Sequence, residues 1–154
     1  MKNQNIEPAN FLKTNSVIFY ALLAGMIIMA GMMCLMNPTQ NFDFDLKNQL
    51  LVIMLVAMIA GIFGSNFLYN FFKNKIENNN SIGEKIAKIQ SANLARLALV
   101  EAPALLGIVL YMVESNLAFL MLSAIMILYF LTLKPSKDKI LDDMNLTSDE
   151  RRQF

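Results

Sequence analysis

The charged residues of this 154-residue chain fall into five short stretches, and the runs between them are long and apolar. An α-helix needs about 20 apolar residues to cross the hydrocarbon of a bilayer, so runs of this length indicate membrane spans. The hydrophobic fraction of 56% and the mean hydropathy of +0.46 agree with that pattern. Lipid is therefore the predicted solvent for most of the chain.

Polar turns divide the apolar sequence into four predicted spans. Proline ends the first span at Asn37-Pro38, and the turn Glu114-Ser115-Asn116 separates the last two. The spans cover residues 14–36, 49–72, 91–113 and 117–133. Two helical hairpins of this kind predict an all-α integral membrane four-helix bundle, with residues 1–134 as the membrane domain.

Helical extensions are predicted outside the membrane. Ser81 and Glu84 have the spacing of a capping box, so the third helix is expected to begin near residue 82. Its first turns are amphipathic and are expected to project from the membrane before the helix enters it. Residues 135–154 form a polar cytoplasmic C-terminal tail, in which Ser136 can cap a short helix.

The distribution of Lys and Arg predicts the orientation of the chain. Two lie in the N-terminal tail, four in the connection between the second and third spans, and five in the C-terminal tail, eleven in all. Lys47 alone lies in the first connection. Because cytoplasmic loops carry the excess of these residues, both termini are predicted to be cytoplasmic, in a bacterial inner membrane. Residues 1–13 are expected to be a retained tail, because the apolar run that follows is too long for a signal peptide.

Glu101 lies within the third span and is the candidate functional residue. At about 1.5 Å per helical residue it is roughly 15 Å from Ser91 and roughly 20 Å from Glu114, which places it near the bilayer midplane. A carboxylate there is costly, so it is expected to face the bundle interior or water, to accept hydrogen bonds, or to keep its proton. Because intramembrane acids commonly belong to ion pathways, Glu101 is the candidate ion-binding residue.

Candidate hydrogen-bond partners of Glu101 occur on the same helix and on neighbouring spans. Arg96 is five residues away, roughly 140° around the helix axis, so it is not an ideal helical pair and is expected to reach toward the interface. The other polar candidates near Glu101 or around Arg96 are Ser65, Asn66, Tyr69, Asn70 and Tyr20. A network that fixes the register of the helices is the favoured interpretation, and ion handling is the alternative.

Proline and glycine mark further positions in the spans. Pro103 removes one helical hydrogen bond and frees the carbonyl group of Leu99 beside Glu101. A packing kink is the favoured interpretation, and a coordination site is the alternative. The glycines predicted to permit close approach of helices are Gly25, Gly31, Gly61 and Gly64.

Several classes of function are disfavoured by what the sequence lacks. It has no histidine and a single cysteine, Cys34, so neither a metal site nor a disulfide is predicted. It contains no nucleophile with an adjacent base, no P-loop and no GxGxxG, and its basic residues lie where the topology requires them. We therefore predict a protein that is not an enzyme, with no cofactor and no nucleic-acid partner. The cytoplasmic lysines are expected to attract anionic lipid headgroups.

The segment LALVEAPALLGIVL, residues 97–110, resembles the carboxylate helix of the c subunit, or proteolipid, of rotary ATP synthases. In that family a membrane-embedded carboxylate takes up and releases the coupling ion, and the matching position here is Glu101. In this chain the acid is in the third rather than the last helix, and the polar loop of the family is missing. The whole-chain pattern looks like small bacterial membrane proteins of four helices, a resemblance that implies no function.

Three functional hypotheses follow from the sequence. The leading one is a non-enzymatic structural or accessory subunit of a larger membrane complex, whose partners are the lipid bilayer and other membrane subunits or further copies of itself. Its docking surfaces are expected to be the extension of the third helix and the C-terminal tail. The second hypothesis is a proton- or ion-translocating proteolipid-like subunit that uses Glu101. The third is a small transporter, which requires a water-filled cavity at the midplane.

Overall fold

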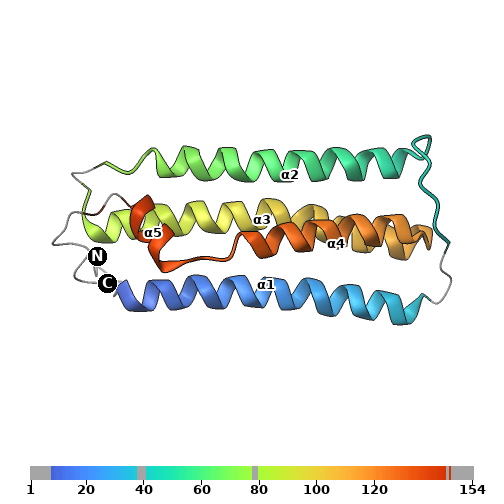
Figure 1. Ribbon diagram of the computed structural model, residues 1–154, viewed down its shortest axis with the longest axis horizontal. Coiled ribbons are helices and arrows are strands. Elements are labelled where there is room, and N and C mark those ends of the chain that lie inside the picture. The colour runs from blue at the N-terminus through green and yellow to red at the C-terminus, as the bar shows by residue number, and fades with distance from the viewer. Residues whose placement is uncertain (1–7, 38–40, 78–79, 145, 147–154) are drawn as a thin grey trace, which may run out of the picture.

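The structure, a computed structural model, describes residues 8–37, 41–77, 80–144 and 146. Across these residues the protein is all-α, with five helices and no β-strand (Figure 1). The helices are α1 (Pro8–Met36), α2 (Gln49–Lys73), α3 (Ile82–Glu114), α4 (Leu117–Thr132) and α5 (Lys137–Asp143).

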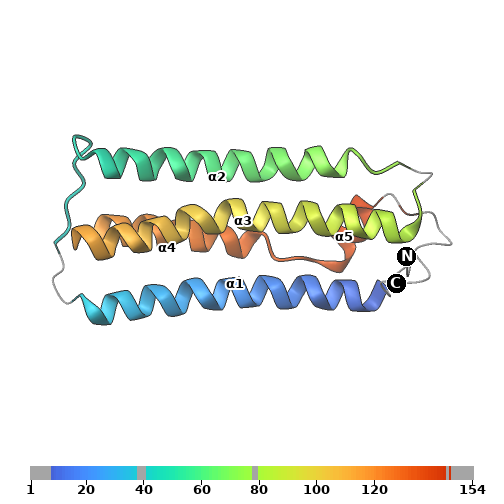
Figure 2. The ribbon, with the colours of Figure 1, turned by 180° about the vertical axis from the view of Figure 1, so that it is seen from behind.

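Helices α1 to α4 lie lengthwise side by side, and α3 occupies the centre of the bundle (Figures 1 and 2). It contacts α1, α2 and α4, and α1 and α2 lie on opposite sides of it. We call one end of the bundle the terminal end. Helices α1 and α3 begin there, α2 ends there, and α5 lies there. We call the opposite end the turn end. Helices α1 and α3 end there, and α2 and α4 begin there. The start of α1 and α5 thus share one end, as two helical hairpins require.

The predicted spans coincide with described helices. Helices α2 and α4 begin at the predicted residues, and α3 is one continuous helix from Ile82, as its capping box predicts. Helix α1 begins at Pro8, six residues before the predicted span, because proline is well suited to the first position of a helix. Among the described helices, α1, α2 and α3 are long and apolar enough to cross a membrane.

Helix α4 is shorter than a typical membrane span. Its 16 residues measure about 24 Å, less than the roughly 30 Å of a bilayer's hydrocarbon core. Helices α4 and α5 together meet the length requirement, but they are bent by 73° relative to each other. The described chain therefore has three helices that can each cross a membrane, and a fourth if the bent pair is counted as one span.

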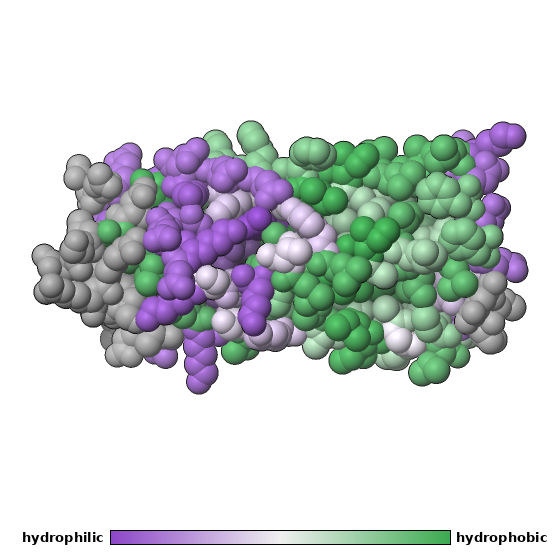
Figure 3. Space-filling view, viewed as in Figure 1, coloured by the Kyte–Doolittle hydropathy of each residue, from purple (hydrophilic) through white to green (hydrophobic). Residues whose placement is uncertain are grey.

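The surface of the molecule is divided along its length. On the face drawn in Figure 3, hydrophilic residues gather over the terminal end and again at the tip of the turn end, and hydrophobic residues cover the surface between them. The large apolar residues that are exposed on α2 include Val56, Ile59, Phe63 and Phe67. A surface of this kind is unfavourable in water and suits contact with lipid tails. The projection of the terminal end from the membrane stays a prediction.

Two clusters of buried side chains hold the helices together. The larger fills the apolar part of the bundle and includes the stacked rings of Phe19 and Phe130, whose centroids are 5.1 Å apart. The smaller lies at the terminal end and joins α1, α3 and α5 through Phe11, Ile76, Ile86, Ile89, Ile140 and Met144. The amphipathic side of the α3 extension therefore packs against the C-terminal helix of the same chain.

Polar caps fix the ends of the helices. The capping box of α3 is formed as predicted, with Ser81 N donating to Glu84 Oε2 at 3.0 Å and Glu84 N donating to Ser81 Oγ at 3.3 Å. Ser136 caps α5, also as predicted. At the turn end, Asn116 caps α4 and exchanges hydrogen bonds with the backbone of Asp43 on the first connection. This last contact ties the two connections at the turn end together.

Two of the four predicted packing glycines are not at helix contacts. A Cβ at Gly25 or Gly31 would meet nothing within 4 Å, because most of α1 faces away from the bundle. Gly61 does allow a close approach, since its Cβ would lie 2.7 Å from the carbonyl oxygen of Leu99. Gly107 is tighter still, with Ser123 Oγ only 2.2 Å from the Cβ position, and the sequence pattern did not identify it.

Candidate functional site

Glu101 lies on α3 within the apolar part of the bundle and is partly exposed. No hydrogen bond or ion pair joins its carboxyl group to any other residue that the structure describes. Its level along the bundle is set by Gly61 of α2, which packs against Leu99 and Pro103 on either side of the acid. Hydrogen-bond partners were one of three expectations for this acid, beside contact with the bundle interior or water and a retained proton, and the described part of the chain supplies no such partner.

The depth of Glu101 follows from its distance to Arg96. Arg96 Nη2 donates to Asn66 Oδ1 at 2.9 Å, and Asn66 Nδ2 donates to the hydroxyl of Tyr129 at 2.9 Å. Tyr129 lies in the last turn of α4, so Arg96 is level with the end of that helix. Glu101 is five residues further toward the turn end, a rise of about 7.5 Å. It lies inside the apolar part, on the side nearer the terminal end.

The side of α3 that carries Glu101 is open over several turns. Leu94 is 49% exposed, Ala98 and Ala102 are exposed, and Leu105 is only partly buried. These residues follow one another at spacings of three and four, so they share a helix face with Glu101. We call Leu94, Ala98, Glu101, Ala102 and Leu105 the open face of α3. In Figure 2, which shows α3 between α1 and α2, α4 lies on the far side of α3.

Arg96 is the centre of a polar network near the terminal end. Besides its hydrogen bond to Asn66, its guanidinium group lies 4.8 Å from the centroid of the Tyr69 ring, an arrangement typical of a cation–π contact. The hydroxyl of Tyr69 donates to Asp143 of α5, and Lys73 Nζ donates to the same carboxylate at 2.5 Å. The network therefore links α2, α3, α4 and α5.

The remaining predicted partners lie apart from this network. Ser65 is fully buried and its hydroxyl donates to the carbonyl oxygen of Ile62 at 2.8 Å, within its own helix. Tyr20 is 50% exposed and contacts Phe19 edge to face, with Lys134 Nζ 5.7 Å from its ring. Asn70 is exposed on α2. No described hydrogen bond joins any of these three to Arg96 or to Glu101, so the structure brings together only Asn66, Tyr69 and Arg96.

Pro103 is buried where α3 packs on α2. Its missing N–H frees the carbonyl oxygen of Leu99, which faces the Cα of Gly61. Glycine permits that approach because it has no Cβ. The freed carbonyl is thus covered by a neighbouring helix, which favours the packing interpretation over the coordination site.

The network contains residues that sequence reasoning did not select. Tyr129 is 63 residues from Asn66, and Asp143 is 74 residues from Tyr69. Lys73 and Asp143 also lie outside the predicted spans, where charged residues are expected whether or not they form a network. No local pattern connects such positions, so only the packing of α4 and α5 onto α2 could reveal them.

Comparisons of the chain with protein-family models, with curated proteins and with solved structures find no match. The resemblance of residues 97–110 to the proteolipid carboxylate helix stays a prediction.

Proposed function

We propose that this chain is a non-enzymatic subunit of a larger membrane assembly. In this proposal it crosses a bacterial inner membrane four times with both termini in the cytoplasm. A transmembrane helix of a partner protein lies on the open face of α3 and donates a hydrogen bond to Glu101. The observation that carries the proposal is the position of Glu101, an acid within the apolar part of the bundle with no described partner.

An unpaired carboxylate is costly in lipid, where water cannot hydrate it. The cost is offset if a second helix brings a hydrogen-bond donor such as Lys, Arg, Asn or Ser to the acid. Ala98 and Ala102 beside Glu101 are exposed and small, so the backbone of a second helix can approach closely there. Both the chemistry and the shape of the open face therefore suit a helix that carries a polar donor.

A different protein suits this face better than a second copy of the chain. In a twofold dimer the same face occurs on both subunits, so Glu101 of one copy would lie near Glu101 of the other. The nearest base on the same helix, Arg96, already binds Asn66 and stacks on Tyr69. Two acids without a free base repel each other unless they share a proton.

The docking surfaces expected from the sequence are occupied in part within the chain, and residues 145 and 147–154 of the tail lie outside the described residues. Ile86 and Ile89 of the α3 extension and Ile140 of α5 belong to one buried cluster. The apolar sides of these residues therefore pack within this chain and are not free to bind another protein. This occupation favours a partner contact inside the membrane.

Gentle detergent extraction of the native protein, followed by mass spectrometry of what co-purifies at fixed stoichiometry, tests the proposal. We expect at least one other membrane protein with the wild-type chain and its loss with Glu101→Leu. Glu114→Gln is the matched control, because this exposed acid lies at the end of the same helix. A purified homo-oligomer, a chain without partners, or an unchanged partner set with Glu101→Leu would contradict the proposal.

The second candidate function is ion translocation through Glu101. The observation that favours it is the same unpaired and partly exposed carboxyl group, because a proton carrier must be reachable from outside its own bundle. Carbodiimide reacts with protonated carboxyl groups in membranes and tests this candidate directly. Failure of Glu101 to react at any pH where the protein stays folded would exclude it. The third hypothesis, a small transporter, gains no support from the open face.

A further inference from the structure

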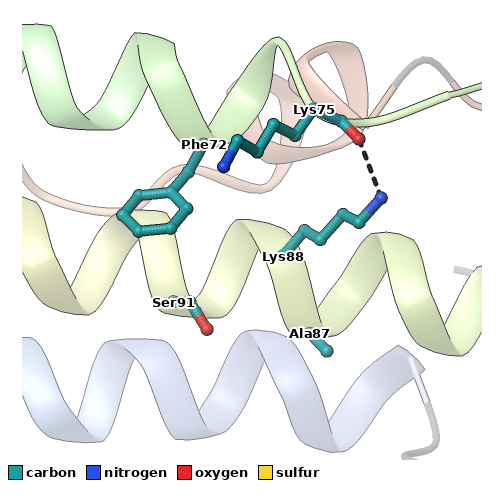
Figure 4. A pocket seen from close by; sticks show the side chains of 5 residues that line it. All are labelled: Phe72, Lys75, Ala87, Lys88 and Ser91. Atoms are coloured by element: carbon teal, nitrogen blue, oxygen red, sulfur yellow. Dashed lines mark hydrogen bonds between the residues drawn. The ribbon is translucent and has the colours of Figure 1, made fainter.

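A small cavity lies at the terminal end between the last turn of α2 and the α3 extension (Figure 4). Its volume is about 290 Å³, and it is lined by Phe72, Lys75, Ala87, Lys88 and Ser91. Two of these five side chains are cationic, one is a hydroxyl donor, and none is acidic. The cavity therefore combines positive charge with an aromatic wall.

The lysines are held in place by other groups. Lys88 Nζ donates to the carbonyl oxygen of Lys75 at 2.7 Å and to Asn80 Oδ1 at 2.8 Å (Figure 4 shows the first). An ammonium group has three donors, so one N–H of Lys88 is left for a further acceptor. Lys75 Nζ lies 4.2 Å from the centroid of the Phe71 ring and is exposed. Two acidic residues lie near the lysines in sequence: exposed Glu77, two residues after Lys75, and Glu84, four residues before Lys88. Glu84 accepts hydrogen bonds from Asn80 and Ser81.

The cavity lies where the polar and apolar parts of the molecule meet. Ser91 is followed along α3 by Leu94, which is 49% exposed, and Phe72 is preceded on α2 by exposed Phe67 and Phe71. Exposed apolar surface for acyl chains therefore begins at Phe71, beside the ammonium group of Lys75. This order, cation then aromatic ring then aliphatic surface, matches the order of chemical groups from headgroup to tail in a phospholipid.

We propose that this cavity binds the phosphodiester headgroup of an anionic glycerophospholipid. Lys75 and Lys88 pair with the headgroup charge, Ser91 donates a hydrogen bond to it, and the acyl chains lie along α2 beside Phe67 and Phe71. The proposal goes beyond the attraction of any lysine to an anionic membrane, because it assigns the charge to two lysines of a single cavity. It is independent of the partner helix proposed at Glu101.

The test is native mass spectrometry of the full chain in detergent, titrated with phosphatidylglycerol or with phosphatidylcholine of the same acyl chains. We expect the wild-type chain to retain phosphatidylglycerol roughly tenfold more tightly, and Lys75→Gln with Lys88→Gln to remove that preference. Lys13→Gln removes an exposed lysine of α1 at the same end and serves as the matched control, with no expected change. Equal retention of both lipids by the wild type, or an unchanged preference in the double variant, would overturn the proposal.

A second arm separates a lipid from a soluble phosphate. Inorganic phosphate, added in hundredfold excess over the lipid, is expected to leave phosphatidylglycerol bound, because it lacks acyl chains. Displacement would assign the cavity to a soluble anion and overturn the lipid proposal. If the double variant does not fold, Lys75→Gln alone is used, since its ammonium group makes only the ring contact with Phe71 among described residues. That variant is expected to lose about half of the preference on a logarithmic scale.

Discussion

Gly107 is the most tightly packed of the described glycines and lies where α2, α3 and α4 meet. A Cβ there would lie 2.2 Å from Ser123 Oγ and 2.6 Å from Met54 Cε. We predict that Gly107→Ala lowers the free energy of unfolding in detergent by about 1–3 kcal/mol, the usual cost of overpacking. Gly25→Ala is the control, because it meets no atom within 4 Å and is expected to leave stability equal or slightly higher. Equal midpoints for the two variants would contradict the packing.

Glu101 is predicted to reduce the stability of the isolated chain. Because its carboxyl group has no described partner, Glu101→Leu is expected to raise the free energy of unfolding in lipid nanodiscs by about 1–3 kcal/mol, the order of the cost of placing a charge in a membrane. Residues that serve a partner commonly have such a cost in the free subunit. Steric trapping or thermal unfolding of the purified chain measures this change. A loss of stability would indicate that Glu101 has a stabilising contact within its own chain.

At the scale of elements, the contacts that hold α5 to the bundle include the carboxylate of Asp143 and a buried apolar side chain, Ile140. Asp143 accepts hydrogen bonds from Tyr69 and Lys73 of α2, and Ile140 is 3% exposed. We predict that Asp143→Asn increases amide hydrogen exchange in α5 on the order of tenfold, because a charge-assisted hydrogen bond contributes roughly 1.5–3 kcal/mol. Asp138→Asn, an exposed acid in the first turn of α5, is the control and is expected to change exchange little. Unchanged protection with Asp143→Asn would show that the apolar contacts suffice.

Most bounds of the helices could be predicted because local signals determine them. Ser81 with Glu84 begins α3, Ser136 begins α5, and a long apolar run sets the length of α2, whereas α1 begins six residues before its apolar run. The bend of 73° between α4 and α5 could not be predicted, since it depends on where α5 finds its partners. Glycine spacing was also insufficient, because it does not say which side of α1 faces the bundle.

At the scale of the whole molecule, the prediction of the site was partial for the same reason. The sequence identified Glu101, Arg96, Asn66 and Tyr69 as polar groups within the spans, and three of them form a network. It could not show that Glu101 stands outside that network, because this depends on the rotation of α3 against its neighbours. A rotation of one residue, about 100°, would turn the acid toward a different helix.

The orientation of the chain is a further prediction at this scale. In a Cys34→Ser background, Asp45→Cys at the turn end is expected to react in intact cells with a maleimide that does not cross membranes. Asn74→Cys at the terminal end is expected to react only after the cells are opened. Both positions are exposed, so the side of the membrane on which each cysteine lies decides whether the maleimide reacts with it. The reverse pattern would contradict the orientation that the lysines predict.

Photocrosslinking in living cells tests the central claim, that a partner helix lies on the open face of α3, most directly. A photoreactive amino acid at Ala98 or Ala102 is compared with one at Phe63, which is 72% exposed on the outer side of α2. We expect Ala98 and Ala102 to give one discrete crosslinked protein of fixed mass, and Phe63 to give none. Identical patterns at all three positions, or no protein adduct at Ala98 and Ala102, would contradict the account.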